Sequence, residues 1–119
     1  MIFVVNKKNH IPTPSDFYIG RGSPLGNPYI FQKSKFGPPN CSSREEAIEL
    51  YKKYLVDKIE KHDRIICEEL NRIYNAEKNG DVYLVCFCYP LACHGAIISD
   101  IIQKKINENR IKQSDGNVT

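Results

Sequence analysis

Short apolar runs alternate with longer periodic segments along the chain, and this pattern predicts a mixed α/β protein. Residues 2–5 and 17–19 are short runs of β-branched and aromatic side chains, which predict two strands. Residues 82–86 are continuously apolar, as is typical of a central strand that is covered on both faces. We expect residues 29–31 to pair briefly at a sheet edge.

Three segments carry apolar residues at steps of three and four positions, and each predicts an amphipathic helix. The first begins at a capping box, Ser43 followed three residues later by Glu46, and runs to about residue 61. The second covers about residues 63–79 and ends at Gly80, an ordinary helix terminator. The third runs from Gly95 to about residue 110.

The order of these elements predicts an α/β fold, a small sandwich of three to four mostly parallel strands packed with about three helices. A chain of 119 residues is the size of one domain, which we place at residues 1–111, with a polar tail at residues 112–119. The segments show no internal repeat.

The amino-acid composition excludes several classes of protein. The chain is 41% hydrophobic and 26% charged, as expected of a folded globular protein. The longest uncharged stretch, residues 82–99, is interrupted by Pro90, His94 and Gly95, so it does not predict a membrane span. The five cysteines are odd in number and three lie within eight residues, which argues against a disulfide framework. We therefore expect reduced thiols and a cytoplasmic location, in the host cell if a phage encodes the protein.

Positive charge is concentrated at the start of the chain. Residues 1–40 contain five basic side chains and one acidic one, a net charge of +4, while residues 41–119 contain 12 basic and 13 acidic ones, a net charge of −1. The whole chain carries only +3, too little for the broad basic surface of a nucleic-acid protein. The charge distribution favours a small anion near the loop-rich first third.

The first candidate site is the glycine and proline loop at residues 20–28. Its three glycines expose backbone N–H groups that favour an anion, and Arg21 offers two parallel donors to a phosphate. The spacing fits neither a Walker loop nor a dinucleotide fingerprint. A tight structural turn that returns to extended backbone at Pro28 remains the alternative. The predicted ligand-binding residues here are Gly20, Arg21, Gly22, Ser23, Leu25, Gly26 and Asn27.

The second candidate site is the cysteine and histidine loop at residues 86–95. Zinc is one interpretation, but four candidate ligands crowd into nine residues, so we expect no metal. Alternatively, the N-terminus of the third helix favours an anion or the reactive thiolate of Cys93. Burial is the expectation for Cys86 and Cys88, and ligand contact for His94. The predicted ligand-binding residues here are Cys88, Cys93, His94 and Gly95.

Both loops leave the carboxyl ends of predicted strands, where open α/β sheets bind ligands, so we expect them to line one pocket. Neighbouring tyrosines are candidates for stacking on a base; they are Tyr18, Tyr29 and Tyr89. An enzyme at this site would use Cys93 or His94, with Asp16 and Asp100 as further general-base candidates. His10 and His62 are expected to be exposed to solvent.

Three motifs follow in order along the chain, reading YIGRGSPLGNP at residues 18–28, SREEAI at residues 43–48 and LVCFCYPLACHG at residues 84–95. With them the chain resembles a small α/β domain of unknown function that is common in phages and bacteria. Members of that family more often carry Trp where Phe87 stands and Pro where Ala92 stands. The resemblance implies the fold and a pocket but no reaction, so it assigns no catalytic residue.

These observations favour a small phosphorylated nucleotide as ligand, ADP-ribose-like or a cyclic signalling nucleotide, bound without a cofactor. We expect a protein that sequesters this nucleotide, in a phage anti-defence role, and that forms a homo-oligomer. Two alternatives stay open. One is an enzyme that acts on a nucleotide by hydrolysis or glycosyl transfer through Cys93 and His94, and the other is a nucleic-acid-associated module.

Overall fold

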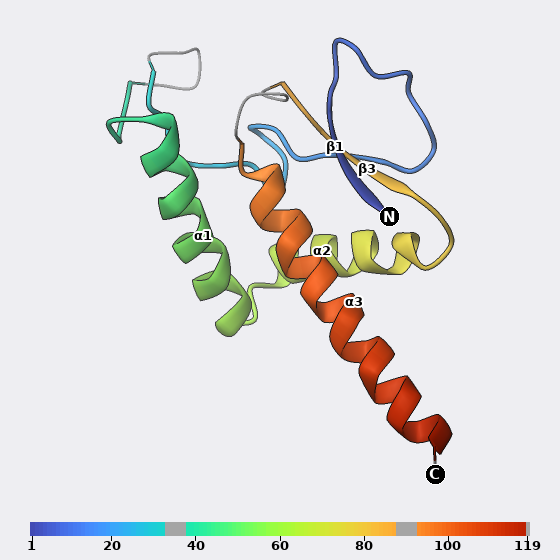
Figure 1. Cartoon of the computed structure of the whole chain (residues 1–119). Helices are drawn as coiled ribbons and strands as arrows, with labels where there is room; N and C mark the ends of the chain where they lie inside the picture. The colour runs from blue at the N-terminus through green and yellow to red at the C-terminus, as the bar shows by residue number, and fades with distance from the viewer. Residues whose placement is uncertain (33–37, 88–92, 119) are drawn as a thin grey trace.

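Within residues 1–32, 38–87 and 93–118, which the computed structural model describes, three strands and three helices follow one another in the predicted order (Figure 1). The strands are β1 (Ile2–Asn6), β2 (Asp16–Tyr18) and β3 (Val82–Cys86). The helices are α1 (Arg44–Glu60), α2 (Arg64–Glu77) and α3 (Gly95–Val118). The predicted α/β fold is confirmed.

The three strands form one parallel sheet with β3 in the middle, in the order β1-β3-β2. Leu84 of β3 lies between Val4 of β1 and Phe17 of β2 in the register of the sheet. Because all three strands run the same way, their carboxyl ends lie along one side, which we call the carboxyl edge. The loops that follow β1, β2 and β3 all start from this edge.

The two faces of the sheet are covered differently. Val82, Leu84 and Cys86 point to the face on which the helices pack, and all three are buried. The helices contribute to the same core; their buried side chains include Tyr51, Leu55, Ile66, Leu70, Ile73, Ile98, Ile102 and Ile106. On the other face the imidazole of His10, from the loop between β1 and β2, packs on the ring of Tyr83. The central strand is therefore covered by helices on one side and by a loop on the other.

Side chains cap the starts of the first two helices, and the cap at Ser43 is the one that the sequence predicts. Ser43 Oγ accepts the N–H of Glu46 over 3.1 Å. The carboxylate of Glu46 accepts the N–H and the hydroxyl of Ser42, one residue earlier than an ideal capping box. Asp63 caps α2 by accepting the N–H of Ile66 over 3.1 Å. These bonds satisfy donors that the first helical turn leaves without partners.

One predicted strand and one predicted helix end were wrong. No strand forms at residues 29–31, because the backbone N–H of Ile30 donates to Asn40 Oδ1 over 2.6 Å and its oxygen accepts the N–H of Asn40 over 2.7 Å. The third helix continues to Val118 instead of ending near residue 110. Residues 111–115 contain no glycine or proline that would end the helix. This last part of α3 extends away from the core (Figure 1).

No helix within the described ranges combines the length and the apolar character needed to cross a membrane.

Candidate functional site

The glycine loop that follows β2 consists of two consecutive turns. In the first, the N–H of Ser23 donates to the backbone oxygen of Gly20 over 3.1 Å, and Gly22 has a φ of 92°. A positive φ at this third position is what a type II turn requires, and glycine adopts it without steric cost. In the second turn, the N–H of Gly26 donates to the oxygen of Ser23 over 3.0 Å, with Pro24 at the position that favours proline.

Arg21 holds this loop together by hydrogen bonds to its backbone. Its Nη1 donates to the backbone oxygen of Asn27, and its Nη2 donates to the backbone oxygen of Tyr29 over 2.8 Å. The guanidinium, predicted to meet a phosphate, thus binds two carbonyl groups of its own loop. A planar fork of donors suits this task, because both oxygens are held at once.

The loop is anchored to α1. The hydroxyl of Tyr51 donates to the backbone oxygen of Leu25 over 2.7 Å, and both side chains are fully buried. Burial raises the pKa of Tyr51, so its hydroxyl keeps the proton that it donates. The buried amide of Asn27 donates to the oxygen of Ala47 over 3.2 Å. Leu25 and Asn27, both predicted to bind ligand, are therefore packed into the protein.

One of the loop glycines is required by close packing. A Cβ on Gly26 would lie 2.7 Å from the backbone oxygen of Gly20, whereas a Cβ on Gly20 would displace only the exposed side chain of Tyr18. Tyr18 folds back over the loop, and its hydroxyl donates to the oxygen of Arg21 over 3.3 Å. Ser23 Oγ also donates within the loop, to Gly20 over 2.6 Å. Packing and hydrogen bonds within the loop therefore account for Gly26 and Ser23.

The cysteine and histidine loop meets the glycine loop through His94. This side chain is 6% exposed, and its Nε2 donates to the backbone oxygen of Ile19 over 2.5 Å. The imidazole also packs against the ring of Tyr51, with 4.9 Å between ring centroids and an interplanar angle of 73°. Gly95 follows, and a Cβ there would lie 2.9 Å from Val4 Cγ1. The two predicted loops are thus brought together at the carboxyl edge, while a shared ligand pocket stays a prediction.

Two buried thiols lie beside this junction. The sulfur atoms of Cys86 and Cys93 are 3.7 Å apart, and the residues are 1% and 8% exposed. Cys86 Sγ donates to the oxygen of Val5 over 3.6 Å, whereas Cys93 Sγ accepts the N–H of Gly95 over 3.3 Å. Cys86 is buried as expected. Cys88 lies outside the described residues.

An exposed aromatic pair also stands at the carboxyl edge. The rings of Tyr18 and Phe87 meet edge to face with 6.2 Å between their centroids, and the ammonium of Lys7 lies 5.8 Å from each centroid. Tyr18 is 40% exposed and Phe87 53%. The side-chain amide of Asn6 donates to the backbone oxygen of Phe87 over 3.3 Å, which restrains the backbone that carries the second ring. We call Lys7, Tyr18 and Phe87 the carboxyl-edge surface.

The sequence predicts base stacking for Tyr18, but Lys7 and Phe87 were not predicted to belong to a binding surface. The signal was available, because alternate residues of a strand point to the same face. Continuing that alternation from Tyr83 through β3 leads to Phe87. Tyr29 packs instead against Tyr54, with 6.4 Å between ring centroids, and Tyr89 lies outside the described residues.

His10, expected to be exposed, is partly buried against the sheet. Its Nε2 donates to Asp16 Oδ1 over 2.9 Å, and Thr13 Oγ1 donates to the same oxygen over 2.7 Å. The N–H of Thr13 donates to Asp16 Oδ2 over 3.2 Å. Burial opposes ionisation of Asp16, but these bonds outweigh it and hold the pKa of the carboxyl below its ordinary value. The sequence missed this cluster because contact with Tyr83 depends on the path of the loop.

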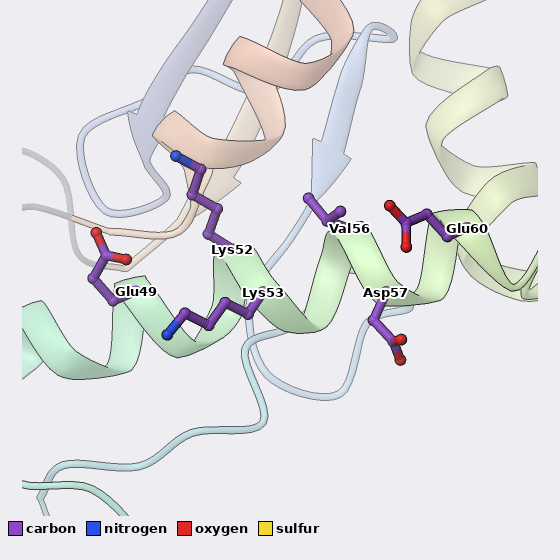
Figure 2. A pocket seen from close by; sticks show the side chains of 6 residues that line it. All are labelled: Glu49, Lys52, Lys53, Val56, Asp57 and Glu60. Carbon is purple, nitrogen blue, oxygen red and sulfur yellow. The ribbon is translucent and has the colours of Figure 1, made fainter.

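An open groove of about 400 Å³ lies elsewhere, along the outer side of α1 (Figure 2). All of its lining side chains come from this one helix; they are Glu49, Lys52, Lys53, Val56, Asp57 and Glu60. Acidic and basic groups both line it, with the two lysines between Glu49 and the acidic residues Asp57 and Glu60, and such a mixture of charges is ordinary on a solvated helix face. None of the predicted site residues lines this groove.

The other candidate acid and base groups are dispersed. Asp100 is exposed on α3, and Asp16 is occupied by His10 and Thr13. Among the residues that the structure describes, no three histidine, cysteine, aspartate or glutamate side chains gather in a way that suits a metal ion. The described candidates therefore do not form a catalytic pair open to solvent.

Comparison with known proteins places the chain in a family. The model of the family described as a domain of unknown function, DUF4326, matches residues 4–104. A search of curated proteins and a search of solved structures each found no significant match. The matched range begins in β1, includes the glycine loop and the cysteine and histidine loop, and ends within α3. The chain therefore belongs to the DUF4326 family, a domain of unknown function.

Proposed function

We propose that this protein binds a small phosphorylated nucleotide on the carboxyl-edge surface. The observation that carries the proposal is the exposed pair of rings, Tyr18 and Phe87, with the ammonium of Lys7 beside both. The pair stands where the loops of adjacent parallel strands meet, the usual ligand position in open α/β sheets. An aromatic platform next to a cation fits a ligand that is flat at one end and anionic at the other.

The base is the flat end. Stacking on Phe87 or Tyr18 would remove exposed apolar ring surface from water, and one base–aromatic contact contributes about 1–3 kcal/mol. Because every nucleobase has a face that stacks, this contact gives affinity without identifying the base. An ADP-ribose-like ligand and a cyclic signalling nucleotide both satisfy it.

The phosphate is the anionic end. Lys7 is held near the rings, and Lys8 follows it on the exposed side of the loop. Lysine serves as a point charge for phosphate. A surface built around three side chains suits one small ligand, whereas a duplex makes many phosphate contacts over a broad basic face.

Binding without turnover is the proposed activity. General acid–base catalysis needs a group within hydrogen-bond reach of the substrate. His94 and Cys93 are buried, and His94 Nε2 is engaged by Ile19. Sequestering a signalling nucleotide needs only affinity and a matching protein concentration. For a phage-encoded protein, this is an anti-defence role.

Calorimetric titration with ADP-ribose, cyclic dinucleotides and nucleoside mono- and triphosphates tests the proposal. We expect at least one ligand to bind with a stoichiometry near one per chain. Phe87→Ala should weaken that binding about 5- to 150-fold, the loss of one stacking contact. Lys7→Ala should weaken it less and reduce its dependence on salt.

Phe3→Ala is the matched control. Phe3 is also an exposed phenylalanine on the same face of the sheet, in register with Tyr83, about 13 Å along the strand direction from Phe87. It should keep the wild-type affinity. Absence of binding to every compound, or equal losses in Phe3→Ala and Phe87→Ala, would overturn the proposal.

Recovery of the ligand separates binding from turnover. The protein is incubated with the ligand, denatured, and the released compound is analysed. We expect the intact compound in stoichiometric amount. Conversion over many cycles that is lost in Cys93→Ala would establish an enzyme instead.

A further inference from the structure

We propose that Cys86 and Cys93 are a redox-active pair that closes into a disulfide when the protein meets a peroxide. Their sulfur atoms are 3.7 Å apart, one at the end of β3 and the other just before α3. A disulfide bond is about 2.05 Å long, so the sulfurs need to approach by less than 2 Å, roughly. Neither residue forms a disulfide bond in the structure.

The hydrogen bonds give the two sulfurs different roles. Cys93 Sγ accepts the N–H of Gly95, the first residue of α3, and such a donor at a helix N-terminus favours the thiolate. Cys86 Sγ donates to the oxygen of Val5, which requires the protonated thiol. Cys93 is also the more exposed of the two, at 8% against 1%. Cys93 is therefore the attacking sulfur and Cys86 the resolving one.

The reaction takes place in two steps, with hydrogen peroxide as the oxidant. The Cys93 thiolate attacks one peroxide oxygen, the O–O bond breaks, and Cys93 sulfenic acid and hydroxide form; the hydroxide takes up a proton to become water. The Cys86 sulfur then attacks Cys93 Sγ, the S–O bond breaks, and the departing hydroxyl leaves with the Cys86 proton as a second water. Two thiols are oxidised to one disulfide, and one peroxide is reduced to two waters.

Peroxide is the oxidant that suits this site because it is small. A larger disulfide reagent needs more access to Cys93 than an 8% exposed residue offers. The new bond closes a ring from Cys86 to Cys93, and this ring contains Phe87. Oxidation would therefore restrain the backbone beside the carboxyl-edge surface, a consequence that rests on the proposed function, whereas the disulfide itself does not.

The test uses the whole chain, reduced and freed of reductant, treated with an equimolar amount of hydrogen peroxide. We expect the intact mass to fall by about 2 Da, the loss of two hydrogens, and to recover with a thiol reductant. Peptide mapping of the wild-type protein should locate the bond between Cys86 and Cys93. A bond that joins Cys88 to either residue, or no bond, would overturn the proposal without any variant.

Two variants test the assigned roles. Cys86→Ser removes the resolving thiol, so Cys93 should accumulate as a sulfenic acid that a dimedone probe labels. Cys93→Ser should give neither the label nor the bond. Labelling of Cys86 in the Cys93→Ser variant as fast as labelling of Cys93 in the Cys86→Ser variant would contradict the assigned order.

Cys41→Ser and Cys67→Ser are the matched controls, because both residues are free and only partly buried. They should oxidise to the same Cys86–Cys93 bond as the wild type. Circular dichroism spectra of all variants identify any that fail to fold, and the wild-type peptide map decides the proposal if they do.

Discussion

His94 Nε2 donates a 2.5 Å hydrogen bond to the backbone oxygen of Ile19, joining the start of α3 to the end of β2. The two residues are 75 positions apart in the sequence, so the bond links two distant segments at the carboxyl edge. A buried histidine with its donor satisfied in this way contributes to the fold, whatever else it does. It also sets the position of the glycine loop, because Gly20 follows Ile19 directly.

His94→Ala should lower the free energy of unfolding by about 2–4 kcal/mol, because it leaves the Ile19 oxygen without this donor and opens a cavity beside Tyr51. Urea denaturation measures the loss. His62→Asn, at an exposed histidine with a positive φ that asparagine also tolerates, should change stability by no more than about 0.5 kcal/mol. Equal effects of the two substitutions would contradict a structural role for His94.

Arg21→Ala should destabilise the protein by about 1–3 kcal/mol, because two charge-assisted bonds to Asn27 and Tyr29 are lost. Arg21→Lys should recover only part of the loss, since one ammonium cannot replace a planar fork. Arg64→Ala is the control, because Arg64 is an exposed arginine that pairs with Glu68 on the surface. Thermal unfolding of the three variants should place Arg21→Ala lowest in Tm.

Acid should weaken the contribution of Asp16 to stability. The folded-state pKa of Asp16 is lowered, so its contribution is fully present above the ordinary aspartate pKa of about 4 and is lost as the pH falls through the folded-state pKa. Unfolding measured from pH 7 to pH 3 should show wild type more stable than Asp16→Asn at neutral pH, with the difference shrinking below about pH 4. Asp100→Asn, at an exposed aspartate, controls for removal of one carboxylate. A difference that grows towards acid would contradict the assignment.

His62→Gly should stabilise the protein by about 0.5–1 kcal/mol, because the steric cost of a positive φ, which glycine avoids, exceeds glycine's own greater loss of chain entropy. His62 has a φ of 56° at the end of α1, where its N–H donates to the oxygen of Ile59 and the N–H of Asp63 donates to the oxygen of Lys58. This is the Schellman arrangement, which usually places glycine at the left-handed residue. His62→Val should have the opposite sign, because a β-branched residue is least tolerant of positive φ. Urea denaturation of the pair distinguishes backbone strain from any role of the imidazole.

The elements that the sequence located best are those with local causes. Ser43 and Asp63 begin helices where their oxygens satisfy the first free N–H groups, and the continuous apolar run at residues 82–86 forms the buried central strand. The double turn at residues 20–26 likewise follows from glycine and proline at fixed positions. Nearest-neighbour chemistry is sufficient for each.

Contacts that depend on the path of a loop were not predicted from the sequence. Arg21 has the chemistry of a phosphate ligand, but its reach to Asn27 and Tyr29 depends on how the loop folds back. The sequence around His10 indicates only a polar loop residue, whereas the folded loop places its imidazole against the ring of Tyr83. In both cases a polar side chain finds a protein partner that its sequence neighbours do not reveal.

By itself the sequence determined the order of strands and helices, the parallel α/β class and the meeting of two unusual loops at one sheet edge, because periodicity, caps and turn residues act locally. Only the tertiary structure decided which side chains of those loops face inward. His94 and Leu25 are buried, while Phe87 and Tyr18 stand exposed beside Lys7. The reason is packing: the side of a loop that faces the core is set by the helices and strands that close over it, and those contacts come from residues far away along the chain.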